Sequence, residues 1–201
     1  MERLNTNFEE YDDPILYDME NELYIEDVPF LLKEALKTIG PIIDLACGTG
    51  RVTIPLASKG HQLIGVDVHR GMLDAARKKS EELNLNIKWV EQDCTKLDLN
   101  IKSHLIYSVG NSFQHFLTNE DQDGLLSSVN KHLHNEGIFI FGTRFPSVDE
   151  LLQSSIEEYW KTYIDSETQY PVDVYTVSNY DSLIKFNIIQ RLGSIKIRME
   201  K

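Results

Sequence analysis

The pattern of apolar and polar positions predicts short buried strands that alternate with helices. Residues 41–46 and 63–66 are brief apolar runs, which are typical of strands buried on both faces of a parallel sheet. Between them, the glycine-containing turn 47–50 leads into a helix predicted over 51–58, with Pro55 close to its start. The second apolar run ends on an acidic residue, Asp67.

The same alternation continues on both sides of this stretch. Further strands are expected at 87–90, 104–110 and 138–142, and helices at 27–39, 70–83 and 119–133. Repeated strand–helix–strand order predicts a doubly wound, mostly parallel sheet of the Rossmann-like type, joined by right-handed crossovers.

Local signals set the ends and faces of these helices. Asp27 is expected to cap the first helix, and Gly40 to stop it. Its apolar face is predicted to contain Phe30, Leu31, Leu32, Ala35 and Leu36. The helix over 70–83 should bury Met72, Leu73, Ala76 and Leu83, and a turn is expected at 135–137, before the last strand.

The pattern changes after Thr143. A helix is expected over 148–160, with Leu151, Leu152 and Ile156 packed. Two strand-like runs follow, at 183–191 and 195–199, separated by 192–194, and they predict an antiparallel hairpin.

Composition narrows the function classes. The 201 residues suit one domain, and the formal net charge of −12 disfavours a nucleic-acid partner, which needs clustered Lys and Arg. Cys47 and Cys94 form no C-x-x-C pair, so neither a zinc site nor any other metal site is expected. Neither a signal peptide nor a membrane span is expected, which favours a cytoplasmic protein.

The glycine turn points to a cofactor that carries a nucleoside. Gly48 and Gly50 let a ligand approach bare backbone, and Asp67 can accept hydrogen bonds from both ribose hydroxyls. The third glycine of the pyrophosphate pattern G-x-G-x-x-G is missing, because Arg51, Val52 and Thr53 follow Gly50. A nicotinamide- or flavin-dependent oxidoreductase is therefore disfavoured.

The segment Asp44–Gly50 (DLACGTG), together with Asp67, resembles the first motif and the ribose-binding acid of class I S-adenosylmethionine-dependent methyltransferases. The resemblance covers about residues 11–180 and is nearest to the small-molecule branch. It implies S-adenosylmethionine as cofactor and one methyltransferase domain over 1–201. Within that domain, 1–40 would form a cap and helix, 41–143 the cofactor-binding core, and 144–201 the substrate side.

The resemblance also implies roles for individual residues. Asp44 would order the turn, Asp67 would bind the ribose, and Asp93 with Cys94 would meet the adenine. The complete set implied for the cofactor is Tyr11, Asp44, Ala46, Gly48, Gly50, Arg51, Asp67, Val68, Met72, Asp93, Cys94 and Val109. Asn111 and Phe113 are implied on the substrate side, where His115 is a candidate base.

Several of these assignments have a simpler structural alternative. Arg51 either meets the cofactor carboxylate or forms a surface salt bridge, and Asp93 either binds adenine or caps a loop. His115, between two phenylalanines, is either a base or a packed, hydrogen-bonded histidine. Residues 1–26 either cap the cofactor, with Tyr11 or Tyr24 near its methionine end, or form a solvated arm.

The family pattern breaks near the carboxyl end. In the resembling enzymes a hairpin covers the substrate pocket, and a further helix and strand pair complete the sheet. That last helix and strand pair is not evident here, so the fold is expected to be C-terminally shortened. The apolar strand 138–141 would then be a sheet edge, covered by the hairpin or by a second copy in a homodimer.

Two functions follow from these observations. The leading one is methyl transfer from S-adenosylmethionine to a small-molecule acceptor. The alternative is a shortened S-adenosylmethionine-binding module without turnover. The N-P-P-Y or D-P-P-Y tetrapeptide of many amino-group methyltransferases of nucleic acids is absent, which agrees with the acidic charge.

Overall fold

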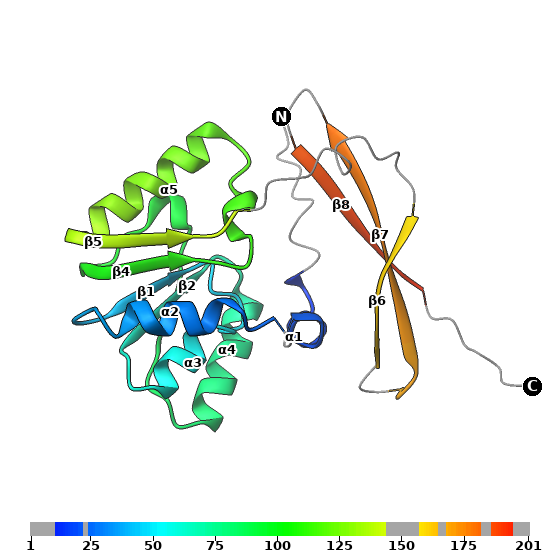
Figure 1. The fold of residues 1–201 in the computed structure, drawn as a ribbon, viewed down its shortest axis with the longest axis horizontal. Helices are drawn as coiled ribbons and strands as arrows, with labels where there is room; N and C mark the ends of the chain where they lie inside the picture. Colours follow the sequence, from blue (N-terminus) through cyan, green and yellow to red (C-terminus); the bar gives the residue numbers. More distant parts are fainter. Residues whose placement is uncertain (1–10, 22–23, 144–156, 165–167, 182–185, 195–201) are drawn as a thin grey trace, which may run out of the picture. The chain divides into compact units, whose positions relative to one another are not determined.

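The computed structural model describes residues 11–21, 24–143, 157–164, 168–181 and 186–194. The chain divides into two compact units, residues 1–144 and 145–201. The first unit holds a parallel sheet with helices, and the second holds an antiparallel sheet (Figure 1). The single methyltransferase domain expected over 1–201 stays a prediction.

The first unit is built on five strands in the order β3-β2-β1-β4-β5, and every neighbouring pair is parallel. The strands are β1 (Ile42–Leu45), β2 (Leu63–Asp67), β3 (Lys88–Glu91), β4 (Ser103–Ser108) and β5 (Leu133–Phe141). This topology confirms the predicted doubly wound sheet. The strand order reverses between β1 and β4, and such a switch point opens a crevice at the carboxyl ends of the strands.

Helices cover both faces of this sheet. Figure 1 shows α2, α3 and α4 on one side and α5 on the other. The helices are α1 (Pro14–Asn21), α2 (Asp27–Ala35), α3 (Thr53–Ser58), α4 (Arg70–Glu82) and α5 (Asn119–His132), with short 3-10 turns at η2 (Cys94–Lys96) and η3 (Ser112–His115). Among the described residues, no helix combines the length and apolar character that crossing a membrane requires.

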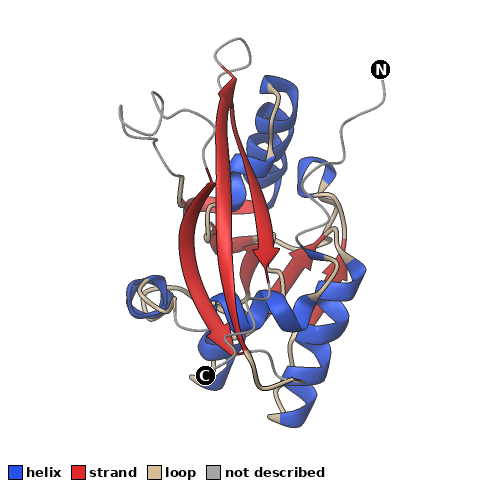
Figure 2. Cartoon of the chain, turned by 90° about the vertical axis from the view of Figure 1, so that its right-hand side faces the viewer, coloured by secondary structure: helices blue, strands red, loops and turns tan. Residues whose placement is uncertain are grey.

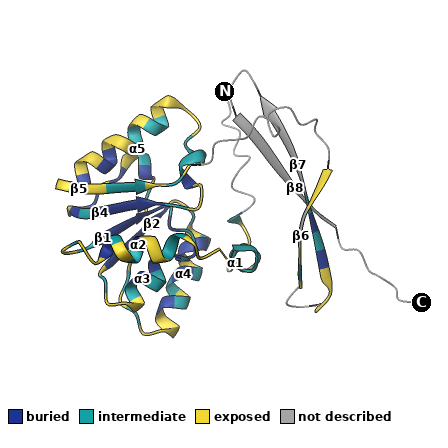
Figure 3. Ribbon diagram, in the orientation of Figure 1, coloured by how far each residue is buried: buried dark blue, intermediate teal, exposed yellow. Residues whose placement is uncertain are grey.

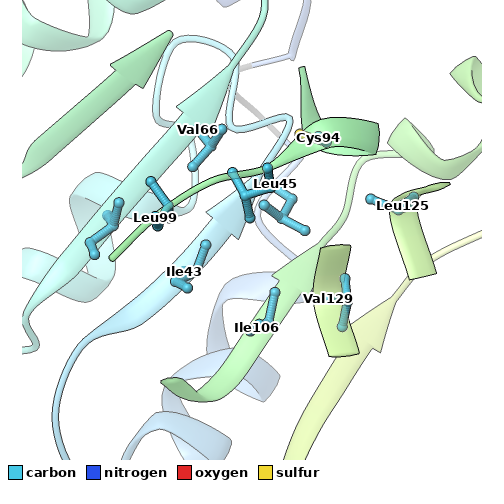
Figure 4. Packing of buried hydrophobic residues seen from close by; sticks show 10 residues of the cluster. Ile43, Leu45, Val66, Cys94, Leu99, Ile106, Leu125 and Val129 are labelled. Atoms are coloured by element: carbon cyan, nitrogen blue, oxygen red, sulfur yellow. The ribbon is translucent and has the colours of Figure 1, made fainter. Parts of the chain in front are cut away.

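Two apolar clusters fix the helices to the sheet. On the α5 face, Leu125 and Val129 pack with Ile43, Leu45 and Ile106 of the central strands (Figure 4). The opposite cluster joins α2 and α3 to the same strands through Leu31, Ala35, Ile42, Val52, Leu56, Leu63, Leu105 and Tyr107. Because β1, β2 and β4 are buried on both faces, their carboxyl ends are held rigidly (Figure 3).

Some predicted helix details are wrong. Asp27 is the first residue of α2 and does not cap it, because its carboxylate binds Arg51. Phe30 is 52% exposed and Leu36 is 79% exposed, since α2 ends at Ala35 and turns only Leu31 and Ala35 fully inward. Leu83, also predicted to be buried, lies just beyond α4 and is 56% exposed.

The turn predicted at 135–137 is also wrong. β5 runs through these residues from Leu133 to Phe141. The strand is irregular at this point: Glu136 has φ +65°, and the register to β4 shifts between Ser103 and Leu105. A bulge of this kind can accommodate an Asn-Glu-Gly sequence without ending the strand.

In the first unit, β5 pairs with β4 alone among the described strands, so the predicted sheet edge is present. Ile138 and Phe141 on this strand are each 43% exposed. Figure 3 shows the mixture of exposed and half-buried positions along β5. The covering of this edge by the chain itself or by a second copy stays a prediction.

The second unit is a three-stranded antiparallel sheet, β6-β7-β8, whose long strands are visible in Figure 2. The strands are β6 (Glu157–Ile164), β7 (Pro171–Asp181) and β8 (Phe186–Ser194). Val172 and Val174 of β7 are buried.

The positions predicted for the elements of the second unit are wrong. The end of the helix predicted over 148–160 is the start of β6, because 157–164 is rich in aromatic and β-branched residues; the rest of it lies outside the described residues. The hairpin is formed by β7 and β8, so 192–194 belongs to a strand and not to a turn. Residues 195–199, predicted as a strand, also lie outside the described residues.

Candidate cofactor-binding site

The turn after β1 has an unusual backbone. Ala46, Gly48 and Gly50 have φ values of +55°, +54° and +82°, a region that L-residues with a Cβ avoid. Glycine adopts this region without strain, whereas Ala46 does not. The turn therefore exposes main-chain atoms at the switch point, with some strain stored at Ala46.

Asp67, at the end of β2, holds this turn in place. The Gly48 N–H donates to Asp67 Oδ2 at 2.8 Å, and the His69 N–H donates to Oδ1 at 2.8 Å. Burial raises the pKa of Asp67, and the hydrogen bonds from His69 and Gly48 oppose that rise. A carboxylate has about four acceptor positions, so Asp67 can still accept bonds from hydroxyl groups of a ligand.

Asp44 lies on β1 opposite Gly65 of β2 and is 3% exposed. The Thr53 hydroxyl donates to Asp44 Oδ2 at 2.5 Å. Burial raises the pKa of Asp44 to about 7, although the bond from Thr53 opposes the rise. The Tyr107 hydroxyl is buried nearby and makes no hydrogen bond with any described residue. This pocket of polar groups is thus incompletely satisfied in the free protein.

Arg51 follows the turn and is held by the N-terminal part of the chain. Its Nη1 and Nη2 donate to the two carboxylate oxygens of Asp27, at 2.8 and 2.6 Å. Nη1 also donates to the Tyr24 carbonyl at 2.5 Å, and the guanidinium lies 5.1 Å from the Tyr24 ring centre. Burial lowers the pKa of Arg51, but the bond to Asp27 outweighs this and leaves the pKa raised.

Residues 11–21 lie across the turn. The Thr49 hydroxyl donates to Asp18 Oδ1 at 2.5 Å, and Lys79 of α4 donates to Asp18 Oδ2 at 2.8 Å. Tyr17 Cε1 lies 3.9 Å from the position that a Cβ on Gly48 would occupy. This segment therefore packs against the turn, and its role as a cap over the cofactor stays a prediction.

A small cavity remains beneath this segment. It is lined by Tyr17, Asp44, Ala46, Cys47, Arg51, Val52, Val109, Gly110 and Ser112. Its volume of about 20 Å³ has room for roughly one water molecule. A ligand larger than a water molecule therefore does not fit in the cavity without a change in its lining.

The predicted substrate-side residues follow β4. Asn111 has φ +63°, and Phe113 packs against Phe141 with ring centres 4.8 Å apart. His115 Nε2 lies 2.8 Å from the Tyr11 hydroxyl. Burial lowers the pKa of His115, so its imidazole is neutral near pH 7. The structure thus brings Tyr11, predicted to meet the cofactor, into contact with His115.

The remaining predicted residues lie at the neighbouring strand ends. Met72 is buried, with its Cε 3.4 Å from the Cβ position of Gly48, whereas Val68 is 52% exposed. Asp93 caps η2 by accepting from the Thr95 N–H at 2.8 Å, the loop-capping role that was its alternative. Cys94 is buried, which raises its pKa to about 12. Both cysteines are unpaired.

Three side chains that hold Asp44, Thr49 and Arg51 in place were not predicted for these roles from the sequence. Thr53 binds Asp44, Asp18 binds Thr49, and Asp27 binds Arg51. None of them carries a local signal, because each acts on a residue at least nine positions away. Only the resemblance to the methyltransferase family suggested that residues 1–26 cap a ligand.

The donor set fits a nucleoside joined to an amino acid. Asp67 can accept from hydroxyls, Asp44 can face an ammonium group, and Arg51 can face a carboxylate. A dinucleotide fits less well, since Thr53 occupies the third glycine position and uses its hydroxyl on Asp44. In the described ranges, no group of three or more His, Cys, Asp or Glu is arranged to hold a metal ion. This fold and this donor set resemble those of the Rossmann-like class of S-adenosylmethionine-dependent methyltransferases.

Comparisons with known proteins agree with this class. Residues 42–137 match the family model of the methyltransferase domain. A putative methyltransferase of Geobacillus sp. strain WCH70 is 26% identical over 138 residues, which cover 68% of this chain and 54% of the relative. Residues 42–137 of the chain are thus similar to a methyltransferase domain, and the fold is the Rossmann-like fold of class I methyltransferases. It spans about half the length of the curated relatives it matches.

Two solved structures share the fold. An S-adenosylmethionine-dependent methyltransferase from Clostridium acetobutylicum ATCC 824 has a TM-score of 0.66 and 22% identity, covering 92% of this chain and 81% of that one. CalS10 from Micromonospora echinaspora, an amino pentose methyltransferase solved with bound S-adenosylmethionine, has a TM-score of 0.65 and 13% identity, covering 91% and 81%.

Proposed function

We propose that the chain binds S-adenosylmethionine at the carboxyl ends of β1 and β2 and transfers its methyl group to a small-molecule acceptor. One observation carries the proposal: Asp67 holds the left-handed turn through the Gly48 N–H and keeps acceptor positions for a ribose. This arrangement places an acidic group and bare backbone together at the switch point.

Each part of the cofactor has a candidate partner in this chain. Asp67 binds the ribose hydroxyls, and Val68 and Met72 flank the adenine. Asp93 caps η2 through Oδ1 and meets the adenine edge through Oδ2, together with Cys94. Ala46, Gly48 and Gly50 border the methionine part, together with Val109. The bound cofactor supplies an electrophilic methyl group on a sulfonium.

The chain's own residues then position the acceptor. Asn111 and Phe113 border the acceptor side, so alignment and proximity supply most of the acceleration. His115 accepts a proton at Nδ1 where the acceptor must lose one, because its imidazole is neutral and Tyr11 occupies its Nε2 at 2.8 Å. A His115→Gln variant should then lose activity most strongly at the pH at which the acceptor is protonated.

The acidic charge and the fold relatives support a small acceptor. A net charge of −12 repels phosphate-rich acceptors and favours neutral or cationic ones. CalS10, which shares the fold, is described as acting on an amino pentose. We include a homodimer that covers the β5 edge as part of the proposal, tested by the molecular mass in light scattering.

Calorimetric titration with S-adenosylmethionine and S-adenosylhomocysteine tests the cofactor part. Micromolar binding is expected for the wild type, and Asp67→Asn should weaken it at least tenfold. Asp98→Asn, an exposed carboxylate paired with Lys131, is the matched control and should bind like the wild type. Absent binding, or equal binding by the Asp67 variant, would contradict the proposal.

A labelled-methyl assay over a panel of amines, alcohols and carboxylates then tests transfer. Formation of a methylated product would support the proposal that the protein catalyses methyl transfer. Tight binding without transfer to any acceptor would favour the alternative, a binding module without turnover.

A further inference from the structure

Arg51, which forms an ion pair with Asp27, lines the small cavity described above. Of the nine described residues that line this cavity, Arg51 is the only cation. Its Nη2 lies 3.5 Å from the position that a Cβ on Gly110 would occupy, which places the guanidinium at the carboxyl end of β4. A ligand carboxylate in this cavity would meet no other positive side chain among those nine.

Three of the five N–H donors of the Arg51 guanidinium have partners among the described residues. Asp27 takes one hydrogen from each terminal nitrogen, at 2.8 and 2.6 Å, and the Tyr24 carbonyl takes the second hydrogen of Nη1. Arginine has five N–H donors, so one on Nη2 and the one on Nε have no partner among the described residues. Both members of the pair are half-buried, with side-chain exposures of 14% and 15%.

We propose that Asp27 is a positioning residue: it holds the Arg51 guanidinium so that the free Nη2 and Nε hydrogens bind the carboxylate of the cofactor's methionine end. This inference rests on the proposed function. Arginine binds carboxylates best through two parallel N–H bonds, and such recognition requires a fixed guanidinium plane. The bidentate contact with Asp27 and the Tyr24 carbonyl fix that plane.

The two parts of the cofactor allow a sharp test. S-adenosylmethionine and S-adenosylhomocysteine carry the carboxylate, whereas 5′-methylthioadenosine keeps the adenosine and the sulfur but lacks the amino-acid end. Asp27→Asn keeps the size of the side chain but loses its charge and one acceptor. It should weaken both carboxylate ligands about tenfold and leave 5′-methylthioadenosine within about twofold of the wild type.

A double-mutant cycle separates positioning from an independent effect. Arg51→Ala should show the same selective loss, and adding Asp27→Asn to it should cause no further loss. Asp27→Glu, which restores a carboxylate, should recover part of the affinity. Melting temperatures of all variants verify that the folded state is retained.

Three outcomes would overturn the inference. Asp27→Asn could bind S-adenosylmethionine as tightly as the wild type, could bind it more tightly because Asp27 competes for Arg51, or could lose all three ligands equally through a general structural effect. A wild type that binds neither S-adenosylmethionine nor S-adenosylhomocysteine is a different result, because it would refute the proposed function and the inference with it.

Discussion

Replacing Asp44 with asparagine should make the protein more stable at alkaline pH. Asp44 is buried at the end of β1, and burial raises its pKa to about 7. Asparagine has the same shape, stays neutral at all pH values and can accept the 2.5 Å bond from Thr53. Its amide also offers donors to the Tyr107 hydroxyl, which has no hydrogen-bond partner among the described residues.

The sign of the pH dependence follows from the two pKa values. The unfolded carboxyl ionises near 3.8 and the folded one near 7, so the folded state holds the proton more tightly. The contribution of Asp44 to the free energy of unfolding is therefore largest below pH 4, falls as the pH rises to about 7, and is constant above that pH. At 1.36 kcal/mol per pKa unit, ionisation of Asp44 lowers the free energy of unfolding by about 4 kcal/mol in total. About 2–3 kcal/mol of this decrease occurs between pH 5 and pH 8.

Urea unfolding at pH 5, 6.5 and 8 measures this effect. Both proteins should carry Trp160→Phe, so that Trp89 is the only tryptophan and reports on the unit that contains Asp44. The advantage of Asp44→Asn should grow by about 2–3 kcal/mol from pH 5 to pH 8, because other ionisations cancel in the comparison. Parallel pH profiles for the two proteins would refute the reasoning.

Three further substitutions test the packing around the site. Gly65→Ala should lower the free energy of unfolding by about 1–3 kcal/mol, because its Cβ would lie 2.4 Å from Trp89 Cζ3. In denaturant unfolding of the double variant, Trp89→Leu should remove most of this loss. Simple additivity of the two substitutions would contradict the clash. Ala46→Gly should stabilise by about 0.5–1 kcal/mol in thermal unfolding, since it relieves φ +55°, whereas a loss of stability would show that Ala46 is unstrained. His132→Leu should lower the free energy of unfolding by about 2–4 kcal/mol, because Nε2 accepts from the Leu99 N–H at 2.9 Å and Nδ1 bonds the Ser128 carbonyl at 2.7 Å. His134 is exposed, so His134→Leu is the control. Equal losses of stability in the two variants would contradict this role of His132.

The sequence predicted the first unit better than the second for a physical reason. Strands buried on both faces are continuous apolar runs, so β1, β2 and β4 were recognisable without their partners. In β6–β8 the pairing partners decide the structure, and strand propensity depends strongly on them. A helix was therefore predicted where β6 begins, and the hairpin was shifted along the chain.

The same distinction holds within the site. Gly48, Gly50 and Asp67 could be predicted because their roles depend on their positions at strand ends. Asp27 could not, because its contact with Arg51 spans 24 residues and depends on how α2 packs. In sequence it is an ordinary acidic helix start, and the N-cap predicted for it is the usual local explanation.

Strain and unsatisfied polar groups concentrate at the carboxyl end of β1. Ala46 has a left-handed backbone, Asp44 is a buried acid, and the Tyr107 hydroxyl beside it finds no partner among the described residues. Such features lower the stability of the free protein, and they persist where function requires them. Ala46→Gly and Asp44→Asn should therefore differ in their effect on binding although both stabilise. The first removes only backbone strain and should leave S-adenosylmethionine affinity within a few fold. The second removes the only acidic side chain among the nine described residues that line the cavity, and should weaken binding of the cofactor's ammonium group at pH 8.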